Sequence, residues 1–121
     1  MEDCKEVDIL AITTTVASRA DAERLARSML ARRLAACVQV EEGLTSFYRW
    51  QGQENADAEV RLTIKTLPAC EGALQALFRE EHPYDVPQFL AVTMRASAEY
   101  LAWVRGEVNL PATSAGVPDA V

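Results

Sequence analysis

The residues best suited to chemistry lie in one stretch, EEHPYDVPQFL, at positions 80 to 90. It contains His82, the only histidine of the chain, between Glu81 and Pro83. A neutral imidazole is a common ligand for copper, zinc and nickel. At the end of a helix, the same side chain can instead interact with the helix dipole or bond the last carbonyls. The residue types therefore allow a metal-ligand role or a structural role for His82.

The chain has three cysteines, Cys4, Cys37 and Cys70, and no CxxC pair. An odd number at this spacing argues against a disulfide framework, so we expect free thiols. Cys37 lies in an apolar segment. One interpretation is a buried cysteine that packs as a small hydrophobic side chain. The other is an accessible cysteine, whose thiolate would suit Cu(I). Cys4, in an acidic N-terminal segment, and Cys70, on the apolar side of a helix, have no predicted role.

Signatures of catalysis are missing from the sequence. It contains no GxSxG turn, no phosphate-binding glycine loop and no HExxH pair. A Cys37–His82 dyad would rest on the two residue types alone. We therefore predict that the protein is not an enzyme.

Charge and hydropathy limit the partners. The net charge is −6 and the basic residues are scattered, with Arg32–Arg33 as the densest pair, so we expect no nucleic-acid partner. No apolar run approaches the roughly 20 residues that span a bilayer. The start, MEDCKEVDIL, has neither the basic nor the apolar region of a signal peptide. We expect a cytoplasmic protein with no membrane partner.

The 121 residues suffice for one domain that positions these side chains. The β-branched run 7–15 predicts a strand, and Ser18 then caps a helix. That helix has one apolar stripe: Ala22, Leu25, Ala26, Met29 and Leu30. Segments 37–42 and 44–51 predict a strand with a bend or bulge at Gly43, which returns as strand 59–66 after a turn near Gly52.

The second half repeats this pattern. Pro68 suits the first turn of a helix that ends before Pro83, and 89–94 reads as a buried strand. The inward side of this helix is Cys70, Ala73, Leu74, Leu77 and Phe78. Ser97 caps a short last helix with Leu101 and Val104 inward. The order predicts an α+β, ferredoxin-like βαββαβ sandwich with an extra C-terminal helix, over residues 7–108. Segments 1–6 and 109–121 are predicted to be tails, the second of them flexible.

One face of such a sheet is left without helices. The predicted hairpin carries Phe47, Tyr48 and Trp50, more aromatic surface than a lone domain of this size leaves in water. Self-association through sheet faces and hairpin edges would cover it. The alternative is that the rings pack inside the monomer.

Four segments resemble the CutA family of divalent-cation tolerance proteins. They are ERLARSMLARRLAACVQVEEGLTSFYRWQGQ (23–53), EVRLTIKT (59–66), HPYDVPQFLAV (82–92) and YLAWV (100–104). The resemblance implies a ferredoxin-like subunit in a homotrimer, an architecture shared with the PII signalling proteins. It also implies tolerance to copper and other divalent metals. We expect weak or transient metal-ion binding and no cofactor required for folding.

The resemblance also implies site residues. The metal ligands would be His82 and Cys37, with Glu59 adding a carboxylate. Thr14 stands roughly where some family members have a further cysteine, so a tight soft-metal site would draw on neighbouring subunits. Four more residues are predicted at a subunit interface or an intersubunit cleft: Tyr48, Trp50, Lys65 and Tyr84.

Two other functions remain open from the sequence. A PII-like signalling module would bind a small anion or metabolite in its intersubunit clefts, an argument from architecture alone. A mainly structural trimer would instead bind a protein partner.

Overall fold

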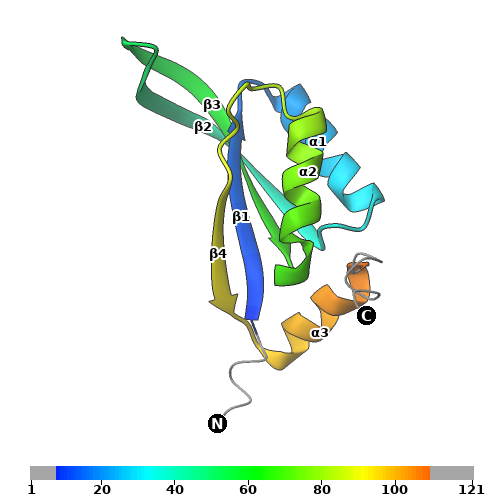
Figure 1. Cartoon of the computed structure of the whole chain (residues 1–121). Coiled ribbons are helices and arrows are strands. Elements are labelled where there is room, and N and C mark those ends of the chain that lie inside the picture. Colours follow the sequence, from blue (N-terminus) through cyan, green and yellow to red (C-terminus); the bar gives the residue numbers. More distant parts are fainter. Residues whose placement is uncertain (1–7, 110–121) are drawn as a thin grey trace.

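A computed structural model of the chain describes residues 8–109 as an α+β fold (Figure 1). The elements in chain order are β1 (Asp8–Val16), α1 (Arg19–Ala31), β2 (Cys37–Trp50), β3 (Gln53–Thr66), the short 3-10 helix η2 (Pro68–Cys70), α2 (Glu71–Glu81), β4 (Leu90–Arg95) and α3 (Ala98–Glu107). This order confirms the predicted βαββαβ arrangement with an added C-terminal helix. The predicted tails 1–6 and 109–121 lie, apart from Asn109, outside the described residues, as does Cys4.

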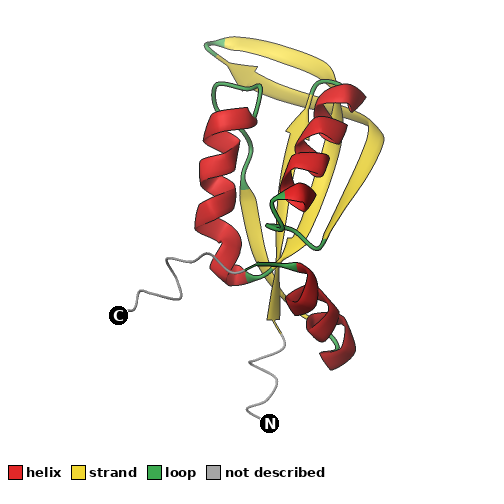
Figure 2. Ribbon diagram, turned by 90° about the vertical axis from the view of Figure 1, so that its right-hand side faces the viewer, coloured by secondary structure: helices red, strands yellow, loops and turns green. Residues whose placement is uncertain are grey.

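The four strands form one antiparallel sheet in the order β2-β3-β1-β4. Helices α1 and α2 lie side by side on one face of it, as Figures 1 and 2 show from two directions. Because side chains alternate along a strand, one set from each strand meets these helices. Ile12, Leu62 and Ile64 belong to that set and are fully buried. We call this side the helix face and the other side the open face.

The core lies between the helices and the helix face. Its fully buried large apolar side chains come from both layers: Ile12, Val16, Leu25, Met29, Leu62, Ile64, Leu74, Leu77 and Val104. Both predicted helix caps are confirmed. Ser18 Oγ accepts from the Asp21 amide at 3.1 Å, and Ser97 Oγ accepts from the Tyr100 amide at 3.1 Å. The described thiols, Cys37 and Cys70, are free, as predicted.

Leu30 departs from the predicted stripe of α1, because its side chain is 44% exposed. An α-helix turns about 100° per residue, so Leu30 lies about 80° around the axis from Ala22. Ala22, Leu25 and Met29 span a narrower arc and take the buried positions. The stripe that meets the sheet is therefore narrower than the sequence pattern suggests.

The β2–β3 hairpin is longer than predicted. Strand β3 begins at Gln53 rather than at position 59, and its first seven residues pair with β2 alone. The segment Ala56-Asp57-Ala58 consists of residues with low strand propensity, so the sequence did not indicate that the strand begins before position 59. The bulge expected near Gly43 is confirmed: the register shifts between Glu41 and Leu44, and Gly43 has φ of +85°. The paired arm extends away from the sheet (Figure 1).

Strand β4 is exposed, contrary to the prediction that 89–94 is a buried strand. All six of its residues are exposed, because β4 is an edge strand that pairs only with β1. On the open face, Leu90, Val92 and Met94 are 57%, 58% and 44% exposed. Phe47, Tyr48 and Trp50 are also exposed in the single chain. Whether copies of the chain cover these side chains stays a prediction.

Within residues 8–109, no helix is long and apolar enough to cross a bilayer.

Candidate functional site

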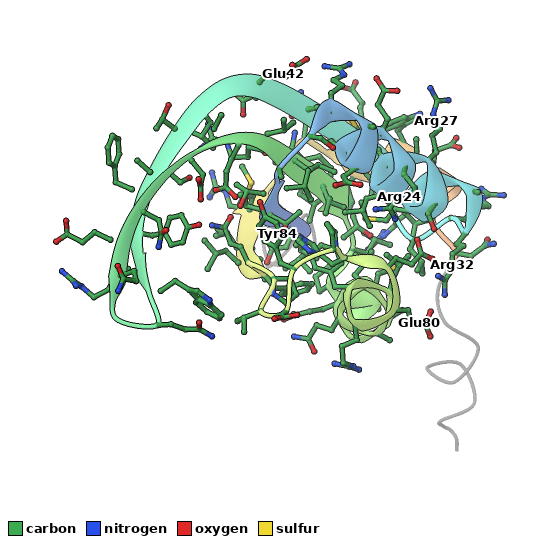
Figure 3. All side chains as sticks on the ribbon, turned by 90° about the horizontal axis from the view of Figure 1, so that it is seen from above. Arg24, Arg27, Arg32, Glu42, Glu80 and Tyr84 are labelled. Carbon is green, nitrogen blue, oxygen red and sulfur yellow. The ribbon has the colours of Figure 1, made fainter. Side chains whose placement is uncertain are left out.

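The C-terminal end of α2 is held against α1 by two arginines. Arg24 Nη1 donates to the backbone oxygen of Glu81 at 3.2 Å, and Arg32 Nη1 donates to the Glu81 carboxylate at 3.2 Å. Figure 3 shows Arg24 and Arg32 directed from α1 toward the end of α2, where Glu80 lies. Each exposed contact contributes little energy. Together they fix the point from which the chain enters His82.

His82 is 8% exposed, and both of its ring nitrogens are engaged. Nδ1 accepts a hydrogen bond from the Tyr84 amide at 3.1 Å, so its lone pair is in use. Nε2 lies 2.9 Å from Thr14 Oγ1. Because Nδ1 is an acceptor, the neutral ring carries its proton on Nε2 and donates it to Thr14. Metal binding at either nitrogen would displace one of these hydrogen bonds.

The surroundings of His82 favour its neutral form. Burial lowers the pKa of its imidazole below the ordinary value of 6.5, and a hydrogen bond with the Thr15 backbone offsets only part of this effect. The rings of Phe78 and Tyr84 lie 5.4 Å and 5.2 Å from it, centroid to centroid. A protonated Nδ1 would also lose the bond from the Tyr84 amide. His82 therefore acts in this structure as a neutral anchor.

Tyr84 continues the anchoring on the other side of the sheet. Its hydroxyl donates to Glu59 Oε2 at 2.6 Å. Thr14 is on the helix face, opposite Leu62, whereas Glu59 precedes Val60 of the helix face and so lies on the open face. The connection from His82 to Phe89 thus crosses the end of the sheet, tied to both faces. Burial, and then the bond to Glu59, raise the pKa of Tyr84.

A pocket of about 700 Å³ lies between this connection and the β2–β3 hairpin. Its walls are Thr15, Ser46, Phe47, Tyr48, Trp50, Glu59, Pro83, Tyr84, Asp85, Val86, Pro87 and Gln88. Figure 3 shows Tyr84 between the curved hairpin and the end of α2. Beside the pocket, the Tyr48 hydroxyl donates to Asp57, a contact that raises the pKa of Tyr48. The pocket is thus aromatic and acidic.

One chain does not bring the three predicted metal ligands together. Cys37 is half-buried and pairs with Lys65, which puts it on the open face, six residues along β3 from the position of Glu59. Six strand residues span about 20 Å. His82 bonds to Thr14 on the helix face. Across residues 8–109, no three His, Cys, Asp or Glu side chains are grouped to hold a metal ion. The ligand roles stay predictions.

The four predicted cleft or interface residues divide into two groups. Tyr48, Trp50 and Tyr84 line the same pocket, whereas Lys65 lies away from it, opposite Cys37. Arg49 lies between Tyr48 and Trp50 in β2, so its side chain is on the other side of the hairpin. There it forms an ion pair with Glu54 at 2.9 Å.

Sequence reasoning missed Thr15, Ser46 and Asp85 in the pocket wall. Ser46 had a detectable signal, because it shares its parity along β2 with Tyr48 and Trp50. No sequence signal pointed to Thr15 and Asp85. They lie in the same pocket wall only because the connection after α2 crosses the end of the sheet.

Comparisons with known proteins agree on one family. Residues 10–107 match a family model described as CutA1 divalent ion tolerance protein. A divalent-cation tolerance protein CutA of Pectobacterium atrosepticum is 35% identical over 110 residues, which are 90% of this chain and 100% of that protein. One of Thermus thermophilus is 39% identical over 95 residues, 78% of this chain and 92% of the relative. The crystal structure of CutA1 from Oryza sativa, 33% identical, superposes with a TM-score of 0.82 over 87% of this chain and 97% of the other.

Proposed function

This chain belongs to the CutA1 divalent ion tolerance family, and on that premise we propose that it acts in tolerance to divalent cations, copper included. In this proposal a cytoplasmic homotrimer binds metal ions weakly or transiently and carries out no catalytic step. The two relatives described above, both divalent-cation tolerance proteins, support the tolerance role. Metal binding, trimer and location are parts of the proposal.

The placement of Cys37 carries the metal part of the proposal. Its thiol is half-buried on the open face, opposite the side on which α1 and α2 lie. Thiolate sulfur is a soft ligand that favours Cu(I). A second copy packed on this face would bring its own ligands close to this thiol, which one chain alone does not do. A shared site of this kind needs no metal for folding of the subunit.

His82 explains why binding would be weak. A metal ion at its imidazole must replace the bond from the Tyr84 amide or the bond to Thr14. An unmade hydrogen bond of a buried group costs about 1–3 kcal/mol. That cost lowers the affinity for the metal and makes the bound state easy to reverse.

The trimer part is supported by the open face. Leu90, Val92 and Met94 form an exposed apolar row on β4 in a single chain. Monomeric soluble proteins rarely leave large contiguous patches of this kind in water. Packing of copies through these faces removes the row from solvent.

Titration with Cu(I) and with Zn²⁺, followed by melting temperature, tests the metal function. We expect both ions to raise the melting temperature of the assembled wild-type protein, and Cys37→Ala and His82→Ala to abolish the rise. Each variant is compared with its own metal-free melting temperature. Glu59→Gln is expected to reduce the rise and Glu54→Gln, on the other side of the hairpin, to leave it unchanged. A wild-type protein that responds to neither ion contradicts the proposal.

A second candidate function is that of a small-molecule signalling module. The pocket of about 700 Å³ favours it, since ligand pockets in proteins commonly have this size. A ligand of this kind would stabilise His82→Ala as much as the wild type. A structural trimer, by contrast, would respond to neither metal nor small molecule and would retain a protein partner in a pull-down.

A further inference from the structure

The pocket beside Tyr84 has a charge that points to one class of ligand. The charged residues in its wall are Glu59 and Asp85, and both are acidic. Among residues 8–109, no arginine or lysine lines it. These carboxylates would repel an anionic ligand at close range, because no cationic side chain in the wall compensates their charge.

These carboxylates are not neutralised by the rest of the described chain. Within residues 8–109, Glu59, Asp85 and the adjacent Asp57 form no ion pair with arginine or lysine. Arg61, two residues from Glu59 on the same face, is paired with Glu41 at 3.0 Å. Tyrosine hydroxyls donate to Glu59 and Asp57 but carry no charge. The negative charge of the pocket therefore stays available to a ligand.

The rest of the wall is aromatic or apolar. Tyr48 and Trp50 from the hairpin and Tyr84 from the connection contribute rings to the pocket wall. Ring faces attract cations, most strongly at tryptophan, and pack on flat apolar groups. An ammonium or guanidinium on a flat apolar body satisfies both parts of the wall, whereas a bare metal ion leaves the rings unused.

We propose that this pocket binds a small organic cation, with its charged group at Glu59 and its apolar body between Trp50 and the rings of Tyr48 and Tyr84. The carboxylate of Glu59 is already oriented by the Tyr84 hydroxyl on Oε2 and has Oε1 for the ligand. This site shares Glu59 with the metal function proposed above, but it does not use the thiol of Cys37, which lies elsewhere on the open face.

Three probes of nearly equal size test the charge selectivity: 2-phenylethylammonium, 2-phenylethanol and 3-phenylpropanoate. Binding to the full-length protein, in its native assembly, is measured by isothermal titration calorimetry and by indole chemical shifts. We expect the ammonium to bind about tenfold or more tightly than the alcohol, and the carboxylate to bind weakest. The indole resonance of Trp50 should shift and that of Trp103, on α3, should not.

Two isosteric variants locate the charge. Glu59→Gln keeps an oxygen for the Tyr84 hydroxyl and removes the negative charge, so the preference for the ammonium over the alcohol should disappear. Glu54→Gln is the matched control on the same strand, because its side chain is on the other side of the hairpin, paired with Arg49. Trp50→Leu should weaken the ammonium and the alcohol alike.

Three results would overturn the proposal. They are equal binding of ammonium and alcohol to the wild type, tighter binding of the carboxylate, and a preference for the ammonium that survives in Glu59→Gln. A wild-type protein that binds no probe, with Trp50 shielded from acrylamide quenching, also overturns it, because a neighbouring copy then fills the pocket. Retained melting temperature of each variant excludes loss of fold as the cause.

Discussion

The imidazole Nε2 of His82 lies 2.9 Å from the hydroxyl oxygen of Thr14, and this contact joins the end of α2 to the C-terminal part of β1. The other ring nitrogen receives the Tyr84 amide, and the Tyr84 hydroxyl reaches Glu59 on the far side of the sheet. Four residues from three separate segments of the sequence are thereby connected at one end of the sheet. In this chain the histidine predicted as a metal ligand forms a hydrogen bond with Thr14, which stands roughly where the family resemblance places a cysteine in some members.

Replacing Thr14 by valine removes the acceptor for the His82 ring proton without changing side-chain volume appreciably. The buried Nε2–H then loses its hydroxyl partner, and we expect a loss of about 1–3 kcal/mol in the free energy of unfolding, measured by urea denaturation. Thr13→Val is the control, since Thr13 points to the open face and is only half-buried. Equal losses in both variants would show that the His82 contact has no special weight.

Stability should fall in mild acid because of His82. Its folded-state pKa is lowered by burial, while the unfolded side chain takes up a proton near pH 6.5. Between these two values the unfolded state binds more protons, so the free energy of unfolding decreases as pH falls. This contribution is complete above about pH 6.5 and is lost toward the lowered pKa. Urea denaturation at pH 7.5, 6.5 and 5.5 measures it, and His82→Asn should have a smaller slope. Parallel curves for the two proteins would contradict the assignment.

Tyr84→Phe deletes the hydroxyl that bonds Glu59 at 2.6 Å and retains the ring. We expect a loss of about 0.5–2 kcal/mol, because a charge-assisted bond is removed from a partly buried site. Amide exchange in the connection from His82 to Phe89 should also accelerate. The matched control is Tyr100→Phe, whose hydroxyl makes no hydrogen bond to another described residue. Unchanged exchange in this connection after Tyr84→Phe would mean that the hydroxyl does not anchor it.

Val92→Asp places a charge in the centre of the exposed row of β4. If copies of the chain pack through their open faces, the charge should dissociate them, because an unpaired buried carboxylate is costly. Sedimentation velocity should show a species of about three times 13.3 kDa for the wild type and the 13.3 kDa chain for the variant. Leu30→Asp, on α1, should leave the assembly intact. A wild type that sediments as a single chain at micromolar concentration rules the trimer out.

Local signals made most of the fold predictable. Ser18 and Ser97 cap helices in the structure as their positions before apolar stripes indicated, and Gly43 marks the bulge of β2. The failures were tertiary. Leu30 is apolar, as the stripe of α1 requires, but it lies at the edge of that stripe and is exposed. Strand β4 is also apolar, but the rest of its own chain does not bury it. Periodicity indicates which side chains are apolar enough to be buried. It does not indicate whether they pack against the same chain or against another copy of it.

The site was predicted only in part, for a geometric reason. His82, Tyr84 and Glu59 were each singled out by residue type or motif, yet their connections depend on a chain segment that passes from the helix face to the open face. No spacing in the sequence encodes that crossing. Thr14 drew attention only as a missing cysteine, whereas the structure makes it the partner of the imidazole.

The first seven residues of β3 pair with β2 alone, so the outer part of the hairpin is a two-stranded ribbon. Insertions or deletions in this ribbon do not reach the core. Their size is nevertheless restricted: adding one residue pair on each strand leaves every ring on its own side, whereas a single-residue insertion in β2 between Ser46 and Tyr48 would turn Tyr48 and Trp50 away from Glu59. The spacing of the rings along β2 thus sets the parity of any change in ribbon length that keeps them on the side of Glu59.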